Sequence, residues 1–455
     1  MWKPTIRILT RELTVVWGTK MQPTYVALVG MGTVGTGVAR LLLEHGDRLA
    51  RPAGRSVVLK HIVDVDLKRP RSITIPSGVL TDDLERVVRD PEVKVVVQLI
   101  GGLEPERTIM MKLLESGKDI VTANKALLAE YGPELFDRAR QLGRSIAFDA
   151  AVAGGVPIIT NIAQCLSANQ ILSLRGILNG TSNFIISQME ERGAEYSAAV
   201  AEAQRRGFAE ANPAMDVNGS DAAQKLAILA HLAYGARVHW RDIPRIGIDQ
   251  LEVADLRYAR ELGYRIKLLA IAQLADGGLE IHVSPTLVRT GLPLSEVREA
   301  NNAIVVVGDA VGRVFYHGPG AGQMPTASAV VADLIDTIVG RTAITFRTLE
   351  LWSAKAPRVT TCDHTAVTGR YYLRFLVEDH PGVLAEIAGI LGRHKISIAS
   401  VIQHEPSEDA ESEKRIVPLV IMTHGAREGS AQAALAEIDK LSSIRQKSVR
   451  MRVLD

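Results

Sequence analysis

The apolar residues in the first third of the chain fall in short runs, separated by segments with helical spacing. The runs at residues 24–29, 57–65 and 93–100 are six to nine residues long and rich in valine, isoleucine and leucine. Such runs are typical of strands buried on both faces of a parallel sheet. Further strands are predicted at 119–121 and 145–152. This alternation of strands and helices predicts an α/β domain over residues 21–156.

A glycine-rich turn follows the first of these strands. Residues 30–35 read G-M-G-T-V-G, and a segment with helical periodicity comes directly after them. Between a strand and a helix, such glycines let the backbone approach a pyrophosphate at the helix N-terminus. A tight turn without a ligand is the alternative. We predict a Rossmann-type dinucleotide-binding domain with the cofactor-binding residues Gly30, Gly32, Thr33, Val34 and Gly35.

The residues after the second strand give conflicting signals about the cofactor. Asp64 or Asp66 could accept hydrogen bonds from a ribose, as in NAD-binding proteins. Lys68, Arg69 and Arg71 follow and could hold the 2′-phosphate of NADP. The acidic residues also come later than usual, because the segment before the second strand looks inserted. The sequence leaves the choice between NAD and NADP open.

The pattern changes after residue 156. Apolar strands are predicted at residues 171–178, 264–272 and 279–288. With the helices between them, they are typical of an α+β fold, and we expect a substrate and dimerisation domain over residues 157–320.

A second glycine-rich loop at residues 318–328 leads into an apolar segment, and a return helix is predicted over about residues 321–341. The helix could pack back on the nucleotide domain and bring Gly320 and Gly322 near the cofactor. A hinge loop is the alternative interpretation.

The stretch from residue 203 to residue 225 gathers charged residues in a loop rich in glycine, asparagine and proline. It contains Glu210, Asp216, Asp221 and Lys225. Asp221 and Lys225 are four residues apart, so they share one face of a helix. Carboxylates beside one ammonium group could hold a substrate amine and deliver a proton. For this stretch alone, a solvated, capped helix start is the better explanation of the pattern.

We predict that this helix spans residues 222–234. Ser220 or Asp221 is a suitable N-cap, and Gly235 ends the helix. Lys125 follows the predicted strand at 119–121. Polar residues at the carboxyl end of a parallel strand face the crevice where such sheets bind ligands, so Lys125 is a further site candidate.

The C-terminal residues predict a small separate module. Residues 342–370 read as an irregular linker, and residues 371–455 as strands and helices in the order βαββα, with Ser430 as a possible N-cap. A D-H-P-G turn at residues 379–382 precedes the first helix of the module. Free amide groups at such a helix start could receive a carboxylate.

Composition narrows the class of protein. The chain has 455 residues, 47% of them hydrophobic and 23% charged, as in a globular protein of about three domains. The net charge of +2 argues against a nucleic-acid binder, and two cysteines fit neither a disulfide framework nor a cysteine-rich metal site. No apolar run reaches the length of a membrane span. We expect a cytoplasmic protein, with residues 1–20 as a loose extension or an early start.

Several segments together resemble homoserine dehydrogenase with a C-terminal ACT domain. Gly207, Asn212-Pro213, Asp216-Val217, Gly219, Asp221 and Lys225 match the family signature at the expected spacing. The segments 121–125, 176–182 and 320–322 are also similar to family segments. The resemblance extends from Tyr25 to about Arg450. It implies an ACT-like βαββαβ module and the interconversion of L-aspartate 4-semialdehyde and L-homoserine with NADP or NAD, the family favouring NADP.

The resemblance also implies roles for single residues. Lys225 would be the proton donor, with Lys125 near the nicotinamide and the reacting oxygen. The substrate-binding residues would be Glu210, Asp216, Asp221, Gly180 and Thr181. A monovalent cation such as sodium would be held by the Asp149 side chain and the carbonyl groups of Val152, Gly154 and Val156.

Three positions depart from the family pattern. Phe208 stands where many members have tyrosine, Asp149 is one methylene shorter than the usual glutamate, and Val65 replaces an arginine that would favour NADP. The resemblance further implies a homodimer or homotetramer and feedback inhibition by L-threonine, whereas a module that only dimerises the enzyme is the alternative.

Two other functions fit the sequence less well. Another amino-acid dehydrogenase with an ACT module would lack the stretch 203–225, which this chain has. An inactive nucleotide or amino-acid sensor would be expected to lose Lys225 or Glu210, and the chain keeps both.

Overall fold

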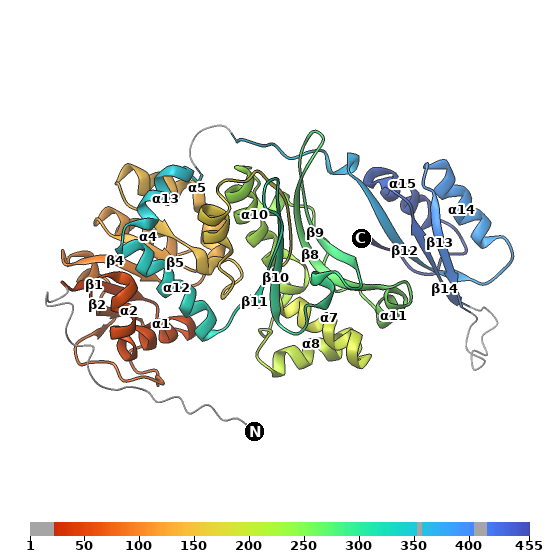
Figure 1. Cartoon of the computed structure of the whole chain (residues 1–455). Helices are drawn as coiled ribbons and strands as arrows, with labels where there is room; N and C mark the ends of the chain where they lie inside the picture. The colour runs from red at the N-terminus through yellow and green to blue at the C-terminus, as the bar shows by residue number, and fades with distance from the viewer. Residues whose placement is uncertain (1–21, 353–356, 405–415) are drawn as a thin grey trace, which may run out of the picture.

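A computed structural model describes residues 22–352, 357–404 and 416–455. The expected N-terminal extension at residues 1–20 lies outside these residues. In Figure 1 the red and orange nucleotide-binding region lies at one end of the molecule and the blue C-terminal module at the other, with the green substrate domain between them.

The nucleotide-binding region is built on a six-stranded parallel sheet. Its strands are β1 (Thr24–Val29), β2 (Val57–Val63), β3 (Leu80–Thr81), β4 (Val93–Gln98), β5 (Asp119–Thr122) and β6 (Ile146–Ala147). Their order is β3-β2-β1-β4-β5-β6, so the direction of winding reverses between β1 and β4. Ligands bind at such a reversal, at the carboxyl ends of the strands. The predicted Rossmann-type fold is confirmed.

The last predicted strand of this sheet is too long. β6 has only two residues, and a 3₁₀ helix over Asp149–Ala151 follows it. The amide of Asp149, the first residue of this 3₁₀ helix, donates to the Asp333 carboxylate of α12 at 2.8 Å instead of to a neighbouring strand.

Helices cover both faces of the sheet. One face carries α1 (Thr33–Glu44), α2 (Gly46–Ala53) and α12 (Gln323–Ile338). The other carries α3 (Glu85–Val88), α4 (Glu106–Glu115) and α5 (Lys125–Gln141). The alternate residues of β1 explain this arrangement: Val26 and Leu28 pack with α12, whereas Ala27 and Val29 belong to the core that contains α4 and α5.

A second, mixed sheet runs through the substrate domain and the C-terminal module. Its strands are β7 (Ile171–Ile177), β8 (Tyr264–Ala275), β9 (Gly278–Arg289), β10 (Asn301–Gly308), β11 (Gly312–Pro319), β12 (Thr368–Glu378), β13 (Ile398–Gln403), β14 (Ile416–Thr423), β15 (Ala426–Arg427) and β16 (Val449–Leu454). The C-terminal strand β16 pairs with β9 on one side and with β12 on the other. It thereby joins the sheets of the two regions, which the sequence did not indicate.

The helices of the substrate domain are α6 (Ile158–Thr160), α7 (Gly180–Arg192), α8 (Tyr196–Arg205), α9 (Ala214–Val217), α10 (Ser220–Tyr234) and α11 (Val253–Glu261). A π-helical segment, Asn161–Cys165, follows α6, and short 3₁₀ helices cover Trp240–Asp242 and Pro293–Glu296. The sheet of the C-terminal module is held against α11 by a buried ion pair, in which Arg374 Nε lies 2.6 Å from the Asp255 carboxylate. Tyr372 donates to the same carboxylate at 3.0 Å.

The C-terminal module has the predicted βαββαβ order, with helices α14 (Val383–Arg393) and α15 (Glu428–Ile438). Two details of the prediction are wrong. The helix α15 begins at Glu428 with Arg427 as N-cap, so Ser430 lies inside it. The region 342–370 is not wholly irregular, because α13 (Arg341–Leu349) and a 3₁₀ helix over His364–Ala366 lie in it. Within the described ranges, no helix is long and apolar enough to cross a membrane.

Candidate active site

The glycine turn after β1 has room for a ligand on one side only. Gly30 has φ +96°, and a Cβ on it would lie 2.9 Å from the backbone nitrogen of Ile100. A Cβ on Gly35 would overlap the Gly30 carbonyl oxygen. Gly32, the N-cap of α1, has no atom within 4 Å of its Cβ position. The first and third glycines therefore close the turn, while the second leaves space at the helix N-terminus, which fits a pyrophosphate.

The second glycine loop lies beside this turn. Gly322 has φ +119° and is the N-cap of α12. The next residue, Gln323, donates from its side chain to the Thr33 carbonyl at 3.0 Å. Thr33 and Val34 are the first residues of α1. The structure therefore places the start of α12, with Gly322 as its N-cap, beside the start of α1.

The residues after β2 are largely engaged with one another. Asp64 accepts the Met31 amide at 2.6 Å, so its carboxylate fixes the glycine turn. Arg71 lies 3.7 Å from Asp64 and donates to the carbonyl of Asp66. Val65 is 95% exposed at the end of the strand. Arg71, one of the residues that could have held a 2′-phosphate, thus stabilises its own loop.

Asp221 is the centre of the charged stretch singled out in the sequence. Lys225 Nζ lies 2.7 Å from Asp221 Oδ2, one helical turn away, and donates to the Leu178 carbonyl at 2.7 Å. The predicted N-cap is wrong: α10 begins at Ser220, and its N-cap is Gly219 at φ +81°. A residue in the left-handed region starts the helix, which leaves the Asp221 side chain available to the site.

Lys125 reaches the same carboxylate from the nucleotide-binding domain. Its Nζ lies 3.2 Å from Asp221 Oδ1. The position is fixed by Asn124, the N-cap of α5, whose side chain accepts the Leu127 amide and donates to the Gly102 carbonyl. A single carboxylate therefore joins two lysines that are 100 residues apart in the chain and come from two domains.

The electrostatics of this cluster favour an ionised Asp221. Burial opposes ionisation, since the residue is only 7% exposed. The charges of Lys225 and Lys125, with hydrogen bonds from Lys225 and Asn179, outweigh burial and hold the pKa of Asp221 well below its usual range. Asp216 behaves oppositely, because burial raises its pKa and the hydrogen bond from Asn179 only partly offsets this.

Asn179 is the site residue that sequence reasoning missed. Its amide nitrogen donates to Asp216 at 2.7 Å and to Asp221 at 2.8 Å, while its side-chain oxygen accepts the Ser182 amide at the start of α7. Asparagine before G-T-S indicated a helix cap. An N-cap uses only the side-chain oxygen, so the free amide was the available signal for a second role.

Gly180 and Thr181 form the first turn of α7 beside this cluster. A Cβ on Gly180 would lie 2.5 Å from the Ala300 carbonyl oxygen, so the close packing of two segments requires glycine there. The Thr181 hydroxyl donates to the carbonyl of Phe208 at 2.7 Å. Phe208 itself is 41% exposed.

Glu210 lies apart from the ion-paired cluster. It is exposed in the segment between α8 and α9, and its backbone carbonyl accepts the Gln204 side chain at 3.2 Å. Among the described residues, no hydrogen bond or ion pair joins its side chain to Lys225 or Lys125. To contact the substrate as predicted, the Glu210 carboxylate would have to extend from this loop toward the cluster of Asp221 and the two lysines.

The residues expected to hold a monovalent cation fit that role only in part. Asp149 accepts a hydrogen bond from the Thr160 amide at 2.9 Å, and the Val156 carbonyl accepts one from the Ile158 amide at 2.8 Å. Two of the four groups expected to coordinate the cation are therefore already hydrogen-bonded within the protein. Burial raises the pKa of Asp149 to about 6. In the part of the chain described, no three His, Cys, Asp or Glu side chains form a metal site.

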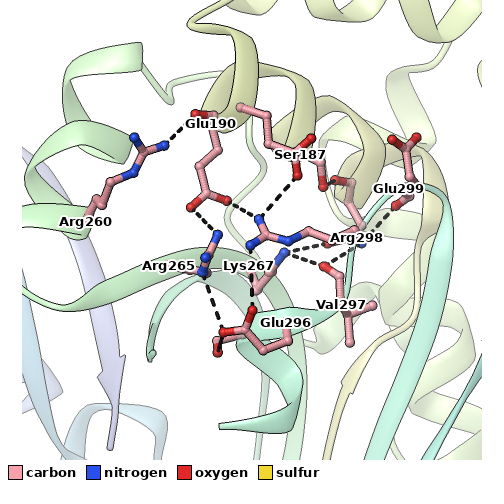
Figure 2. Close-up of polar contacts among 12 residues, drawn as sticks. Ser187, Glu190, Arg260, Arg265, Lys267, Glu296, Val297, Arg298 and Glu299 are labelled. Atoms are coloured by element: carbon pink, nitrogen blue, oxygen red, sulfur yellow. Dashed lines mark hydrogen bonds and ion pairs between the residues drawn. The ribbon is translucent and has the colours of Figure 1, made fainter. Parts of the chain in front are cut away.

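A second charged cluster anchors the far end of α7. Figure 2 shows Glu190 between Arg265 and Arg298, with Lys267 below them. Glu190 lies 3.0 Å from Arg265 and 2.9 Å from Arg298. Lys267 is fully buried and donates to the Val297 carbonyl at 2.6 Å, and burial lowers its pKa to about 8. Because α7 is held at this end, its first turn can present Gly180 and Asn179 in a fixed position.

Comparisons with known proteins match most of the chain. Family models match in three places: "Homoserine dehydrogenase, NAD binding domain" at residues 30–149, "Homoserine dehydrogenase" at 157–335 and "ACT domain" at 371–443. Homoserine dehydrogenase of Pseudomonas aeruginosa is 41% identical over 442 residues, covering 95% of this chain and 99% of its own. That of Synechocystis is 40% identical over 447 residues, covering 94% and 99%. The crystal structure of a homoserine dehydrogenase from Thiobacillus denitrificans superposes with a TM-score of 0.87 at 42% identity, covering 96% of this chain and 99% of that one.

Proposed function

The chain belongs to the homoserine dehydrogenase family, and we propose that catalysis takes place where Asp221 joins Lys225 to Lys125. The activity is that of the family: an NAD(P)-dependent oxidoreductase that interconverts L-aspartate 4-semialdehyde and L-homoserine. The proposal concerns the roles of the residues. The observation that carries it is a carboxylate shared by two lysines at the crevice of the dinucleotide-binding sheet.

The hydrogen bonds of Lys225 suit it to the acid role. An ammonium group has three donors, and Lys225 gives one to Asp221 and one to the Leu178 carbonyl, each at 2.7 Å. The third donor is left for the oxygen of the aldehyde. When bound, the dinucleotide would supply the hydride from its nicotinamide ring, and the turn with Gly30, Gly32 and Gly35 would hold its pyrophosphate. Lys225 then protonates the oxygen, and in the reverse direction it accepts that proton.

Lys125 and the remaining polar residues are proposed to position the reacting groups and to bind the substrate. The Lys125 ammonium stands near the same oxygen and would stabilise negative charge there, because its position is fixed by α5. Asn179 keeps Asp216 and Asp221 at a set separation. Glu210 and Asp216 are the carboxylates proposed to bind the ammonium group of the substrate, with Gly180 and Thr181 lining the space between them.

The test of this assignment is Lys225→Ala, with Lys112→Ala, an exposed lysine of helix α4, as the matched control. Loss of a general acid lowers turnover by about a hundredfold or more. We expect that loss for Lys225→Ala, with unchanged cofactor binding by fluorescence titration, and near-normal turnover for Lys112→Ala. Turnover within a few fold of the parent would remove Lys225 from the acid role.

Cofactor preference, regulation and assembly are further proposals. NADP is the expected cofactor, threonine the expected inhibitor through the ACT module, and a homodimer or homotetramer the expected state in the cytoplasm. Initial rates of homoserine oxidation with NADP and with NAD, each with and without L-threonine, test the first two. Light scattering after size-exclusion chromatography tests the oligomeric state, and a monomer would contradict the proposed assembly.

A monovalent cation site at Asp149 is a separate proposal. If sodium binds there, activity should fall when sodium is replaced by a larger organic cation.

A further inference from the structure

A cavity of about 300 Å³ lies where the substrate domain meets the C-terminal module. Its walls come from β9, β16, α15, the 3₁₀ helix over His364–Ala366 and the segment 244–246. Because β16 pairs with strands of both regions, the cavity is bounded by both. No residue of the catalytic cluster lines it, and the proposed function does not use it.

The walls of this junction cavity carry an excess of positive charge. Arg450 and Arg452 both pair with Glu428, which is 1% exposed, and Arg452 also pairs with Glu280. The third arginine, Arg245, is exposed at the rim, where its guanidinium group donates to the carbonyls of Arg241 and Ile243 and lies over the Trp240 ring. Within the described ranges no carboxylate pairs with Arg245. Three guanidinium groups thus face two carboxylates, and one positive charge is uncompensated.

Each of two imidazole rings in the same walls has one nitrogen without a hydrogen-bond partner among the described residues. The other nitrogen of His282, Nδ1, lies 3.2 Å from the Ser284 hydroxyl, and Nε2 of His364 lies 3.8 Å from the Glu428 carboxylate. His282 is 2% exposed, and its Nε2 has no partner in the described part of the chain, the nearest acidic oxygen being that of Glu280 at 3.4 Å. The Nδ1 of His364 is likewise buried without a partner among these residues. Leaving a buried polar nitrogen without a partner is unfavourable, so two such nitrogens around one cavity favour a bound molecule that supplies their partners.

We propose that the junction cavity binds a small anion bearing a carboxylate or a phosphate group. A guanidinium group matches the geometry of both anions and can give each of them two parallel hydrogen bonds. Arg245 supplies the unpaired charge, and His282 and His364 supply the nitrogens that lack partners. A volume of about 300 Å³ holds a metabolite of several non-hydrogen atoms.

The cavity adjoins the start of the catalytic helix. Its wall residue Ile246 donates to the Val283 carbonyl at 2.9 Å, and Ile248, two residues on, donates to the Val217 carbonyl at 2.8 Å. A Cβ on Gly219, the N-cap of α10, would lie 3.2 Å from Val283. The helix that carries Lys225 therefore begins on the back of the cavity wall, and an anion that moves this wall changes turnover.

Calorimetric titration of the full-length protein with inorganic phosphate, and separately with malonate, tests the site. Saturating NADP keeps the glycine turn filled, and constant ionic strength removes general salt effects. We expect one saturable site per chain. Arg245→Gln removes a charge-assisted contact and should weaken binding about tenfold, and His364→Gln should weaken it less. Arg289→Gln, an exposed arginine of β9 outside the cavity, is the matched control and should bind normally.

The same proteins are then assayed for homoserine oxidation, the one step that rests on the proposed function. The saturating anion should change kcat/KM by about fivefold or more in the parent and much less in Arg245→Gln. No saturable heat with either anion, equal affinity in the parent and Arg245→Gln, or binding without an effect on kcat/KM would each overturn the proposal. Stronger binding of phosphate or of malonate identifies the class of ligand. Failure of the proposed function would appear instead as a parent protein that does not oxidise homoserine but still binds the anion.

Discussion

Replacing Asp221 with asparagine removes the charge that joins the two lysines while keeping the shape of the side chain. The side chains of Asp221 and Lys225 are 10% and 12% exposed, so solvent screens their ion pair little. Removing one partner of a buried ion pair costs about 3–5 kcal/mol. The asparagine oxygen can still accept one hydrogen bond, and Lys125 is 36% exposed, so we expect a loss of about 3 kcal/mol in the free energy of unfolding.

The same substitution should also lower turnover. Without the carboxylate, Lys225 keeps only the Leu178 carbonyl as a fixed partner, and a misplaced general acid loses most of its effect. We expect kcat for homoserine oxidation to fall about a hundredfold. The assay follows reduced cofactor by absorbance, and urea unfolding is followed by circular dichroism.

The pH dependence gives an independent check on Asp221→Asn. The folded-state pKa of Asp221 is depressed, so its stabilisation is complete above the unfolded value of 3.8 and is lost as the pH falls below it. The difference in unfolding free energy between parent and variant should therefore be the same at pH 6 and pH 8.

Asp216→Asn is the matched control for Asp221→Asn. Burial raises the pKa of Asp216, so folding disfavours its ionised form, and an amide there should be neutral or slightly stabilising. Equal loss of stability in the two variants, or less than about a tenfold loss of kcat in Asp221→Asn, would refute the assignment of Asp221 as the bridging charge.

Three further outcomes can be measured. Glu210→Ala should raise KM for homoserine with little effect on protein stability, because the residue is exposed, and an unchanged KM would contradict its substrate role. Gly35→Ala should abolish cofactor binding in a fluorescence titration, since its Cβ would overlap the Gly30 carbonyl, whereas a variant that binds normally would show that the turn can rearrange. Burial lowers the pKa of His231 to about 4, so the folded state should lose up to about 3 kcal/mol as the pH falls from 6.5 to 4, and this slope should vanish in His231→Gln.

The sequence predicted the architecture well where local patterns are strong. Apolar runs of six to nine residues marked the central strands of the first sheet, because strands buried on both faces must be apolar throughout. The glycine turn was equally clear, since Gly30 and Gly35 are required by backbone contacts that any side chain would violate. Helix starts were less certain: the N-cap of α10 is Gly219 and that of α15 is Arg427, because a cap depends on backbone angles as well as on residue type.

The order of motifs along the chain determined the family and which residues are candidates for the site. The tertiary structure alone decided how they combine. Asp221 and Lys225 were predicted neighbours because one helical turn separates them, but the ion pair from Lys125 spans two domains. The amide of Asn179 meets two carboxylates only because α7, α9 and α10 converge. Likewise, the junction cavity exists because β16 crosses from one sheet to the other, and contacts between distant segments leave no periodic trace in a single sequence.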